Sequence, residues 1–395
     1  MMDYYEALAR LKAELPPIDE LEMVPLAACS GRILAEDMVA RYDTPTFDNS
    51  AMDGYAVADP EASLTRFVLC GRTAAGDAPG QGLQAGQAQR VFTGAPVPAG
   101  TTAVVAQENV RVEDDQLILG RPANLGQHLR LRGEEFVAGT TLLSAGLRLG
   151  PASLALAASQ GHAELRVHRR LRVAVFSSGN ELCPPDAELG PGKIHDANRY
   201  QLLGWLALLP VDILDCGILP DNAAITRERI AAAAETCDVI LTSGGVSVGE
   251  EDHLKSALQS LGQLDAWRLA IKPGKPFAWG RAGRAKVFML PGNPVATFVT
   301  FHMLVAPALR CLMGDAVIDP PSWQARAQFD RDGREVRREF LRAVVTQGED
   351  GLSQARLLTG QGSAMLSACV TANALVEAPP STTINAGEWV RVYPL

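Results

Sequence analysis

The sequence predicts a multidomain protein of class α/β plus β, built around one doubly wound α/β domain. First, the chain has 395 residues, which at about 150 residues per domain allows two to four domains. Second, short apolar runs alternate with helical stretches over residues 171–317, a pattern typical of a mostly parallel sheet with right-handed crossovers. Third, β-prone runs with Gly and Pro at their ends lie at 46–137 and 318–395.

The N-terminal part is predicted to be an extended helical domain interrupted by a β-rich insertion. Residues 1–45 show apolar side chains at helical spacing from Tyr5 to Leu15. Helix is expected again over 138–170, where Pro151 suits a first helical position. The intervening 46–137 hold short β-prone runs at 67–69, 103–106 and 117–119, separated by Gly, Pro and Asp. We therefore expect 1–45 and 138–170 to form one domain and 46–137 another.

Residues 171–317 give the clearest alternation. The run at 172–176 is short and apolar, as in strands buried in a parallel sheet. Further strands are expected at 211–216, 238–241, 267–271 and 286–290, and helices at 196–209, 222–235, 252–261 and 294–312. The last segment, 318–395, alternates apolar and polar residues around 323–329 and 388–393, which predicts a small β domain or barrel.

The composition excludes several classes of function. The formal net charge of −9 argues against general binding of nucleic acid or anionic membranes. Seven cysteines without a C-x-x-C pair argue against a disulfide scaffold or a structural zinc site, and the histidines lack the H-E-x-x-H spacing of zinc hydrolases. The N-terminus has no signal-peptide pattern, and no stretch approaches 18 uninterrupted apolar residues, so we expect no membrane span. We expect a cytoplasmic protein.

Chemistry is concentrated in four loops that follow predicted strands of the α/β domain. Ligands of an open α/β sheet bind outside the carboxyl ends of its strands, so we expect these loops to converge on one edge. The loops are SSGNE at 177–181, SGGVSVGE at 243–250, KPGKP at 272–276 and PGNP at 291–294.

Three of these loops suit phosphate. Glycines at 244, 245 and 249, with serines at 243 and 247, let backbone N–H groups approach an anion, although an ordinary βα turn has the same composition. Only six of the 36 basic residues are lysine, and two of them, Lys272 and Lys275, share one short loop. The alternative for this pair is a solvated surface. Pro294 after Asn293 suits a helix start or a purely structural turn.

Carboxylates are expected along the same edge, at Glu181, Asp196, Asp221 and 250–252. Asp196 and Asp221 have the alternative role of helix N-caps. Carboxylates beside phosphate-binding groups are compatible with phosphate if a divalent cation bridges them, and Mg²⁺ prefers a few carboxylates together with phosphate oxygens. The residues alone thus predict a Mg²⁺-assisted site for a phosphorylated or nucleotide ligand. Two further segments, 44–57 and 92–98, read from the residues alone as structural loops.

Eight segments in this order resemble the molybdopterin molybdenumtransferase family, which includes MoeA and the E domain of gephyrin. They are PTFDNSAMDGYAV, FTGAPVPAG, LRGEEF, SSGNEL, IHDANR, LTSGGVSVGEEDH, IKPGKPFAWG and LPGNPVATF. The resemblance implies a homodimer with a helical domain, a β domain, a molybdopterin-binding α/β domain and a C-terminal β-barrel. It also implies insertion of molybdate into adenylylated molybdopterin with release of AMP, assisted by Mg²⁺. Its partners would include the molybdopterin adenylyltransferase and apo-molybdoenzymes.

Transferred by motif, the resemblance implies a set of functional residues. The catalytic set would be Asp53, Thr93, Glu135, Glu181, Asp221, Asp252, Lys272 and Lys275, with Glu181, Asp221 and Asp252 as metal ligands. The cofactor-binding set would be Ser243, Gly244, Gly245, Ser247, Gly249, Pro291, Gly292, Asn293, Pro294 and Ser363. In the family the pocket lies between subunits, which would give the 44–57 and 92–98 loops a function.

The chain departs from the family pattern at two carboxylates. Glu135 stands where the family commonly has aspartate, which keeps the charge and adds one methylene. Asn180 stands where aspartate is common, while Glu181 is kept.

The resulting hypothesis places phosphates on the 243–250 loop and the two lysines, and Mg²⁺ on Glu181, Asp221 and Asp252. Stabilisation of the departing phosphate would supply most of the rate. Molybdate would enter through an anion pocket that includes Arg130, Arg132 or Lys275. Two alternatives remain open: another Mg²⁺-dependent phosphate- or nucleotide-processing enzyme, and a non-catalytic scaffold.

Overall fold

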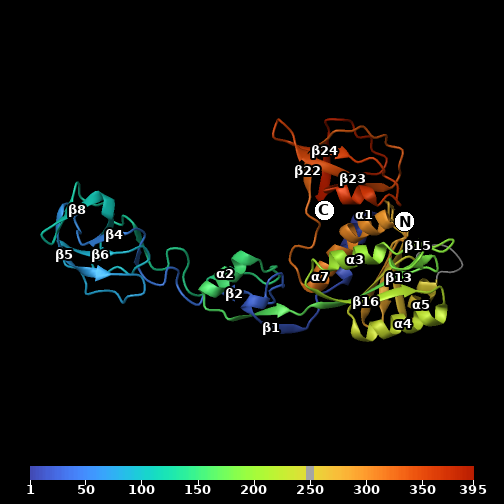
Figure 1. Ribbon diagram of the computed structural model, residues 1–395, viewed down its shortest axis with the longest axis horizontal. Helices are drawn as coiled ribbons and strands as arrows, with labels where there is room; N and C mark the ends of the chain where they lie inside the picture. Colours follow the sequence, from blue (N-terminus) through green and yellow to red (C-terminus); the bar gives the residue numbers. More distant parts are fainter. Residues whose placement is uncertain (246–252) are drawn as a thin grey trace. The chain divides into compact units, whose positions relative to one another are not determined.

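The computed structural model describes residues 1–245 and 253–395 (Figure 1). They form two compact units. The first contains residues 1–36, 145–151 and 164–395, and the second contains 37–144 and 152–163. The predicted site residues Ser247, Gly249 and Asp252 lie outside the described residues.

The centre of the first unit is a six-stranded mixed sheet in the order β16-β13-β17-β21-β20-β18. The first four strands are parallel, whereas β20 and β18 run antiparallel to their neighbours. The doubly wound α/β domain is thereby confirmed. The strands are β13 (Leu171–Ser178), β16 (Val211–Leu219), β17 (Val239–Ser243), β18 (Gly262–Trp267), β20 (Ala278–Ala282) and β21 (Ala285–Leu290).

Helices cover both faces of this sheet because alternate residues of its strands point to opposite sides. One face, which includes Val173 and Leu241, packs against α3 (Asn198–Leu206) and against α6 (Pro294–Thr300) with its continuation. The other face, which includes Ala174 and Ile240, packs against α4 (Ala223–Thr236) and α5 (His253–Leu261). The near-continuous apolar strands seen in the sequence reflect this double burial.

The helix after β21 is long and strongly apolar. It runs from α6 through a π-helical turn, η3 (Phe301–Val305), into α7 (Ala306–Met313). By length and composition residues Pro294–Met313 are apolar enough to cross a membrane, but 83% of that window is buried inside the fold. The segment is therefore accounted for as a core helix.

The strand predicted at 267–271 is wrong. Residues Gly262–Trp267 form β18, and the chain then turns at Arg268, whose φ is +68°. The next strand, β19 (Ile271–Lys272), pairs with a strand of the C-terminal domain and not with the α/β sheet. The antiparallel β20 was also missed, because Gly280 and Arg281 interrupt its apolar pattern.

The C-terminal domain is a closed five-stranded barrel. Strand β23 (Arg338–Gln347) pairs with β24 (Ser353–Leu357), and the ring continues through β22 (Trp323–Ala327), β26 (Trp389–Pro394) and β25 (Ala374–Ala378) back to β23. Its core contains six alanines, which suit the narrow interior of a small barrel. A short helix, α8 (Ser367–Thr371), precedes β25.

The helical segments predicted near the N-terminus are shorter than expected. Helix α1 (Tyr4–Glu14) ends before Pro16, and α2 covers only Pro151–Ser159. Between and beyond them the chain forms paired strands, β1 (Leu21–Pro25) with β12 (Glu164–His168) and β2 (Met38–Val39) with β11 (Thr141–Leu143). Periodicity from Tyr5 to Leu15 thus indicated one helix correctly and did not extend to residue 45.

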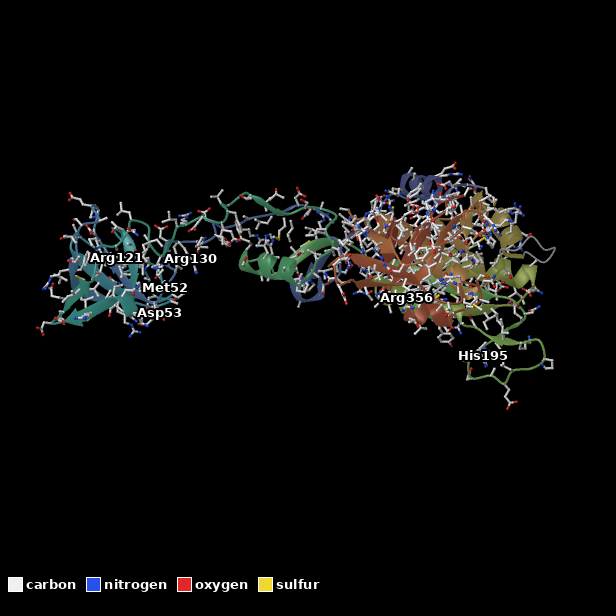
Figure 2. All side chains as sticks on the ribbon, turned by 90° about the horizontal axis from the view of Figure 1, so that it is seen from above. Met52, Asp53, Arg121, Arg130, His195 and Arg356 are labelled. Atoms are coloured by element: carbon white, nitrogen blue, oxygen red, sulfur yellow. The ribbon has the colours of Figure 1, made fainter. Side chains whose placement is uncertain are left out.

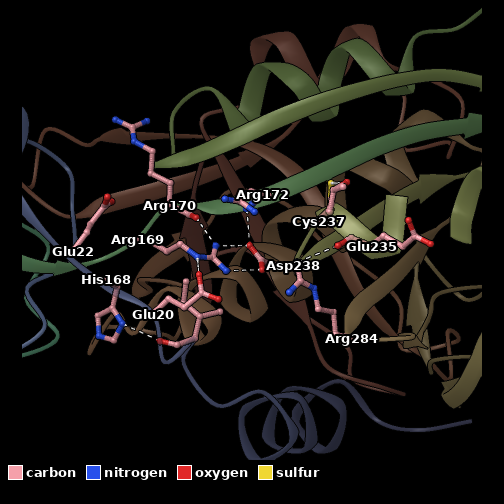
Figure 3. A network of polar contacts seen from close by, with 12 residues as sticks. Glu20, Glu22, His168, Arg169, Arg170, Arg172, Glu235, Cys237, Asp238 and Arg284 are labelled. Atoms are coloured by element: carbon pink, nitrogen blue, oxygen red, sulfur yellow. Dashed lines mark hydrogen bonds and ion pairs between the residues drawn. The ribbon is translucent and has the colours of Figure 1, made fainter. Parts of the chain in front are cut away.

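An ion pair fastens the connection between β12 and β13 (Figure 3). Arg169 Nη1 and Nη2 donate to the two carboxylate oxygens of Asp238 at 2.7 and 2.8 Å, and Arg169 Nε bonds Glu20. Asp238 also accepts from the backbone N–H of Arg172 at 2.8 Å. Burial raises the pKa of Asp238, but these hydrogen bonds outweigh it and hold the pKa below its ordinary value. These ion pairs and hydrogen bonds therefore fix the turn at which the chain enters the α/β sheet.

The second unit contains a six-stranded sheet in the order β7-β4-β6-β5-β9-β8. The three β-prone runs predicted there are confirmed. The strands are β4 (Gly54–Val57), β5 (Arg66–Thr73), β6 (Gln87–Val91), β7 (Ala103–Ala106), β8 (Val110–Glu113) and β9 (Gln116–Leu119), with a smaller pair formed by β3 (Asn49–Ser50) and β10 (Leu129–Arg130). At Gly54 a Cβ would lie 2.1 Å from the Val105 carbonyl oxygen, so the close pairing of β4 and β7 requires glycine.

Candidate functional site

A cavity of about 770 Å³ lies at the carboxyl ends of the parallel strands. It is lined by the loops that follow β13, β17 and β21, by the start of α3, and by Arg268 and Lys275. This is the edge where open α/β sheets bind ligands. Its walls contain these predicted site residues: Glu181, Asp221, Ser243, Gly244, Gly245, Lys275, Pro291, Gly292, Asn293 and Pro294.

The loop after β17 is built from glycine because it touches the end of β13. Gly244 has φ +88° and Gly245 has φ +65°, a region that favours glycine. A Cβ at Gly244 would lie 2.4 Å from the Ser178 carbonyl oxygen, and one at Gly245 would lie 2.4 Å from Leu254 Cδ1. The described part of this loop thus lies close against its neighbours and exposes backbone to the cavity.

Glu181 follows the carboxyl end of β13, and Asp221 follows the carboxyl end of β16. Asp221 Oδ2 accepts the Asn180 N–H at 2.9 Å, and Asn180 Oδ1 accepts the Asp221 N–H at 3.1 Å. Asn180 therefore holds Asp221 in place. The N-cap of α4 is Asn222, so the open alternative that Asp221 caps this helix does not apply.

Asp196 is buried and already paired. Its Oδ1 accepts from Ser177 Oγ at 2.9 Å, and its Oδ2 lies 3.1 Å from Arg199 Nε. Arg199 in turn bonds both oxygens of Asp215 at 2.7 Å. This network fixes the start of α3 at the cavity wall. Within residues 1–245 and 253–395, no group of three or more His, Cys, Asp or Glu side chains is placed to hold a metal.

The structure separates the two lysines that the sequence placed together. Lys272 Nζ lies 3.0 Å from Glu335 and 3.0 Å from Glu339. Arg337 and Lys272 together lower the pKa of Glu335 to about 2, with Arg337 the larger influence. Lys275 instead lines the 770 Å³ cavity. At the sheet edge where the loops converge, the larger cavity is therefore lined by Lys275 and not by Lys272.

Arg268 supplies a second cation that sequence reasoning missed. It lines the cavity from the turn between β18 and β19, and its positive φ is uncommon for a residue with a side chain. Such conformations are found at functional sites more often than elsewhere. Its only signal in the sequence was its place four residues before Lys272.

A second cavity of about 300 Å³ adjoins the first and is lined by the lysine loop and the barrel. Lys275, Pro276, Pro291 and Asn293 line both cavities. Lys272 and Ser363 line the second one only.

Arg342, on β23, also lines this second cavity and is fully buried. Its Nη2 donates to the carbonyl oxygens of Gly360 and Gly362 at 2.9 and 3.3 Å. Its Nε and Nη1 have no hydrogen-bond partner in the part of the chain that the structure describes. Burial lowers the pKa of this guanidinium. Sequence reasoning missed Arg342, since thirty arginines spread along the chain give no pattern that marks one.

Asp53 and Thr93 meet in the second unit. Asp53 Oδ1 accepts the backbone N–H and the hydroxyl of Thr93, both at 2.8 Å, and the backbone bond and the hydroxyl bond lower the pKa of Asp53. Figure 2 shows Asp53 and Arg130 on this β-rich domain. Arg132 is paired with Asp43 at 2.6 Å, and Glu135 is exposed. The two loops that the sequence alone indicated as structural are therefore joined by a specific polar contact.

Comparisons with known proteins agree over the whole chain. Family models match as the MoeA N-terminal region, domains I and II (residues 2–161), a probable molybdopterin binding domain (174–311) and the MoeA C-terminal region, domain IV (324–395). The chain is 38% identical to a molybdopterin molybdenumtransferase of Haemophilus influenzae, covering 100% of this chain and 98% of the relative. It is 34% identical to molybdopterin molybdenumtransferase 2 of Mycobacterium tuberculosis, covering 94% of each.

Solved structures agree with this result. A crystal structure of the molybdopterin biosynthesis MoeA protein from Pyrococcus horikoshii matches with TM-score 0.87 at 29% identity, covering 100% of both chains. A second crystal structure of such a protein from the same organism matches with TM-score 0.81 at 31% identity, covering 100% of this chain and 99% of the other.

Proposed function

The chain belongs to the molybdopterin molybdenumtransferase family, and from this premise we propose that it inserts molybdate into adenylylated molybdopterin, with Mg²⁺ present, and releases AMP. Its general role, transferase activity in molybdenum cofactor biosynthesis, follows from the family. The adenylylated substrate, the metal and the entry site for molybdate are what we propose beyond the family assignment.

One observation carries the proposal: two cavities of different character share a wall. The larger, about 770 Å³, falls in the range of pockets for ligands the size of a cofactor. The smaller, about 300 Å³, is lined by Arg342, whose Nε and Nη1 have no hydrogen-bond partner among the described residues. A phosphorylated heterocycle suits the first, and a small oxyanion suits the second. Lys275 in the shared wall can contact both ligands.

The larger cavity provides groups for phosphate. Backbone of Gly244 and Gly245 faces a ligand without intervening side chains, and Arg268 and Lys275 add positive charge. Such groups, held in place before the reaction, stabilise the charge that develops when a phosphoanhydride is cleaved. The chain's part in AMP release is then to hold the phosphates and to offset the charge of the leaving phosphate.

The carboxylates of Glu181 and Asp221 fit Mg²⁺. Mg²⁺ commonly takes one or two protein carboxylates and completes its shell with water and phosphate oxygens, so a cluster of three is not required. Asn180 holds the Asp221 carboxylate at the cavity wall. When bound, the ion supplies positive charge to the phosphate oxygens. Asp252, the third expected ligand, lies outside the described residues.

The smaller cavity fits a tetrahedral oxyanion. A buried guanidinium with unpaired donors is unfavourable without an anion, because removing a charge from water is costly. Lys272 and Arg337 are paired with glutamates, which leaves Arg342 and Lys275 as the lining cations for the anion, and Ser363 also lines the cavity. We place molybdate here in preference to Arg130 or Arg132. We further propose a cytoplasmic homodimer that receives its substrate from a molybdopterin adenylyltransferase and passes the cofactor to apo-molybdoenzymes.

The test is reconstitution of an apo-molybdoenzyme with adenylylated molybdopterin and low molybdate, with AMP release measured in parallel. The wild-type protein should raise both readouts together. Glu181→Ala and Asp221→Ala should lower Mg²⁺-dependent AMP release by at least about a hundredfold, as expected when groups that act on the transition state are removed. Asp186→Ala, an exposed carboxylate outside the cavity, is the matched control and should leave both readouts unchanged.

Three other outcomes would contradict the proposal. AMP release without active cofactor indicates a general phosphate-processing enzyme. Neither product from a folded protein indicates a scaffold. Unchanged release in both carboxylate variants contradicts the metal assignment.

A further inference from the structure

Asn198 is the residue that joins the two glycine loops beneath the larger cavity. It is the first residue of α3, is 8% exposed and lines this cavity. Its Nδ2 donates to Ser243 Oγ at 2.7 Å and to the Gly292 carbonyl oxygen at 2.7 Å. The loops after β17 and β21 are therefore tied together by one side-chain amide, which uses both of its hydrogens.

The orientation of this amide follows from its partners. A carbonyl oxygen can only accept, so the group facing Gly292 must be the nitrogen. The amide oxygen, Oδ1, consequently occupies the other position. It is buried and has no hydrogen-bond partner among the residues that the structure describes. Leaving a buried acceptor unpaired is unfavourable, and native structures rarely do so without a ligand or water to pair it.

The unpaired oxygen calls for a donor and not for an anion. Phosphate oxygens are acceptors at neutral pH and would repel the amide oxygen, so this point of the cavity floor does not suit a phosphate. The nearest acidic residue in the chain, Asp196, is already bonded to Ser177 and Arg199 and is buried. A ligand group that bonds Oδ1 must therefore carry hydrogen.

The oxygen also lies away from Asp221, one of the carboxylates assigned to Mg²⁺. Asn198 bonds the ends of β17 and β21, whereas Asp221 follows β16 and Glu181 follows β13. In the order β16-β13-β17-β21, with about 4.8 Å between neighbouring strands, the end of β17 is about 10 Å from that of β16. This spacing places Asp221 on one side of the cavity and the Asn198 amide on the other, with Glu181, which follows the intervening strand β13, between them.

On the amide side, glycine residues form the floor of the cavity. A Cβ at Gly292 would have only one atom within 4 Å, the Gly244 Cα at 3.7 Å. Two glycine backbones thus meet beside Asn198, and among the described residues no other atom lies within 4 Å of that Cβ position. A flat ring can lie on such a floor with its edge toward Oδ1.

We propose that Asn198 is a specificity-determining residue whose Oδ1 accepts a hydrogen bond from an N–H on the edge of an amino-substituted heterocycle. The inference rests on the proposed function, in which the ligand carries two such rings, a pterin and an adenine. Both present the same chemistry to the amide, so the experiment has one arm for each. Asn198 then selects the ring by its donor, while Arg268 and Lys275 hold the anionic part.

The experiment measures binding of two matched pairs of probes to the full-length protein by titration calorimetry. The first pair is pterin and an analogue methylated at its ring and exocyclic N–H positions, and the second is AMP and N6,N6-dimethyl-AMP. The wild-type protein should bind one parent compound about tenfold or more tightly than its methylated form. Asn198→Leu, similar in size and without an acceptor, should bring that ratio close to one.

Gln201→Leu is the matched control. Gln201 lies on the same helix, its Nε2 also donates to a carbonyl, that of Pro294, and its Oε1 is also unpaired within the described residues. It does not line the cavity. This variant should keep the wild-type ratio. Because each ratio compares two ligands on one protein, a general loss of folded protein cancels.

Two results would overturn the inference. One is a wild-type protein that binds both members of both pairs equally, a measurement that needs no variant to fold. The other is an Asn198→Leu protein that keeps the wild-type ratio, and weaker Mg²⁺ binding in that protein would reassign the oxygen to the metal. If the protein forms the cofactor but discriminates neither pair, this inference alone fails. If it discriminates but forms no cofactor, the proposed function alone fails.

Discussion

Replacing Arg342 by methionine should abolish most molybdate binding while leaving the protein folded. Arg342 is fully buried, and its Nε and Nη1 are unpaired among the residues described. A hydrogen bond to a charged group contributes about 1.5–3 kcal/mol, which corresponds to roughly a 10- to 150-fold change in Kd for one such bond. If both nitrogens bond the oxyanion, the loss is larger. Arg342→Lys should recover only part of it, since a single ammonium replaces the separate donors.

The change in stability without ligand should be small by comparison. Methionine removes an unpaired buried charge, which is stabilising, and removes two hydrogen bonds to the Gly360 and Gly362 carbonyls, which is destabilising. These effects oppose each other. A saturating ligand at 100 times its Kd stabilises a folded protein by about 2.7 kcal/mol. Molybdate should therefore raise the melting temperature of the wild-type protein and not that of Arg342→Met.

The assay is calorimetric titration with molybdate, with thermal melting in its presence as the second readout. Arg326→Met is the matched control. Arg326 is another barrel arginine with an unpaired Nε among the described residues, but it lies over Trp389 and does not line the smaller cavity. It should bind molybdate as the wild type does. Wild-type affinity in a folded Arg342→Met protein, or an equal loss in Arg326→Met, would refute the placement of the oxyanion.

Three further predictions concern stability and loop geometry. Burial lowers the pKa of His302 from the ordinary 6.5 to about 4, so protonation of this ring favours the unfolded chain. The free energy of unfolding is therefore highest above pH 6.5 and falls by about 3 kcal/mol as the pH drops toward 4. His302→Phe should flatten this part of the urea-unfolding profile. Asp238→Ala removes the carboxylate that accepts two hydrogen bonds from Arg169 at the β12–β13 corner, leaves that guanidinium paired with Glu20, and should lower the free energy of unfolding by about 3 kcal/mol, measured at pH 7. Gly244→Ala places a Cβ 2.4 Å from the Ser178 carbonyl and should weaken AMP binding at least about tenfold; unchanged binding would show that the loop can move.

The α/β domain was largely predictable because burial on both faces leaves a strong pattern. Within the runs predicted at 172–176 and 238–241, residues 173–176 and 239–241 are apolar throughout, and they lie in the adjacent inner strands β13 and β17. The region after residue 261 was less predictable, since β19 pairs with the barrel strand β23, and 66 residues of sequence lie between the members of each residue pair. Local periodicity contains no information about a partner so distant.

The parts of the candidate site that could be predicted are loops whose residue composition itself indicates ligand binding. Single side chains on a helix or a strand could not be predicted as site residues. The glycines at 244 and 245 and the turn at 291–294 were placed correctly on one edge. Asn198 and Arg342 were missed as site residues, because each becomes notable only through what surrounds it in the fold. An asparagine at a helix start and an arginine in a strand are ordinary in sequence, and their unpaired atoms are visible only in three dimensions.

The lysine pair shows why proximity in sequence misleads about charge. Lys272 and Lys275 are three residues apart, yet the first contacts two glutamates that belong to the barrel segment and the second lines the cavity of the α/β domain. The ion pairs of Lys272 attach the loop to the barrel, and the same loop then presents Lys275 to both cavities. One lysine thus sets the position from which the other can act. If this is correct, Lys272→Met should weaken molybdate binding indirectly, by disordering the loop, and adding salt should weaken it less than it weakens the wild type, because the ion pairs that salt screens are already absent.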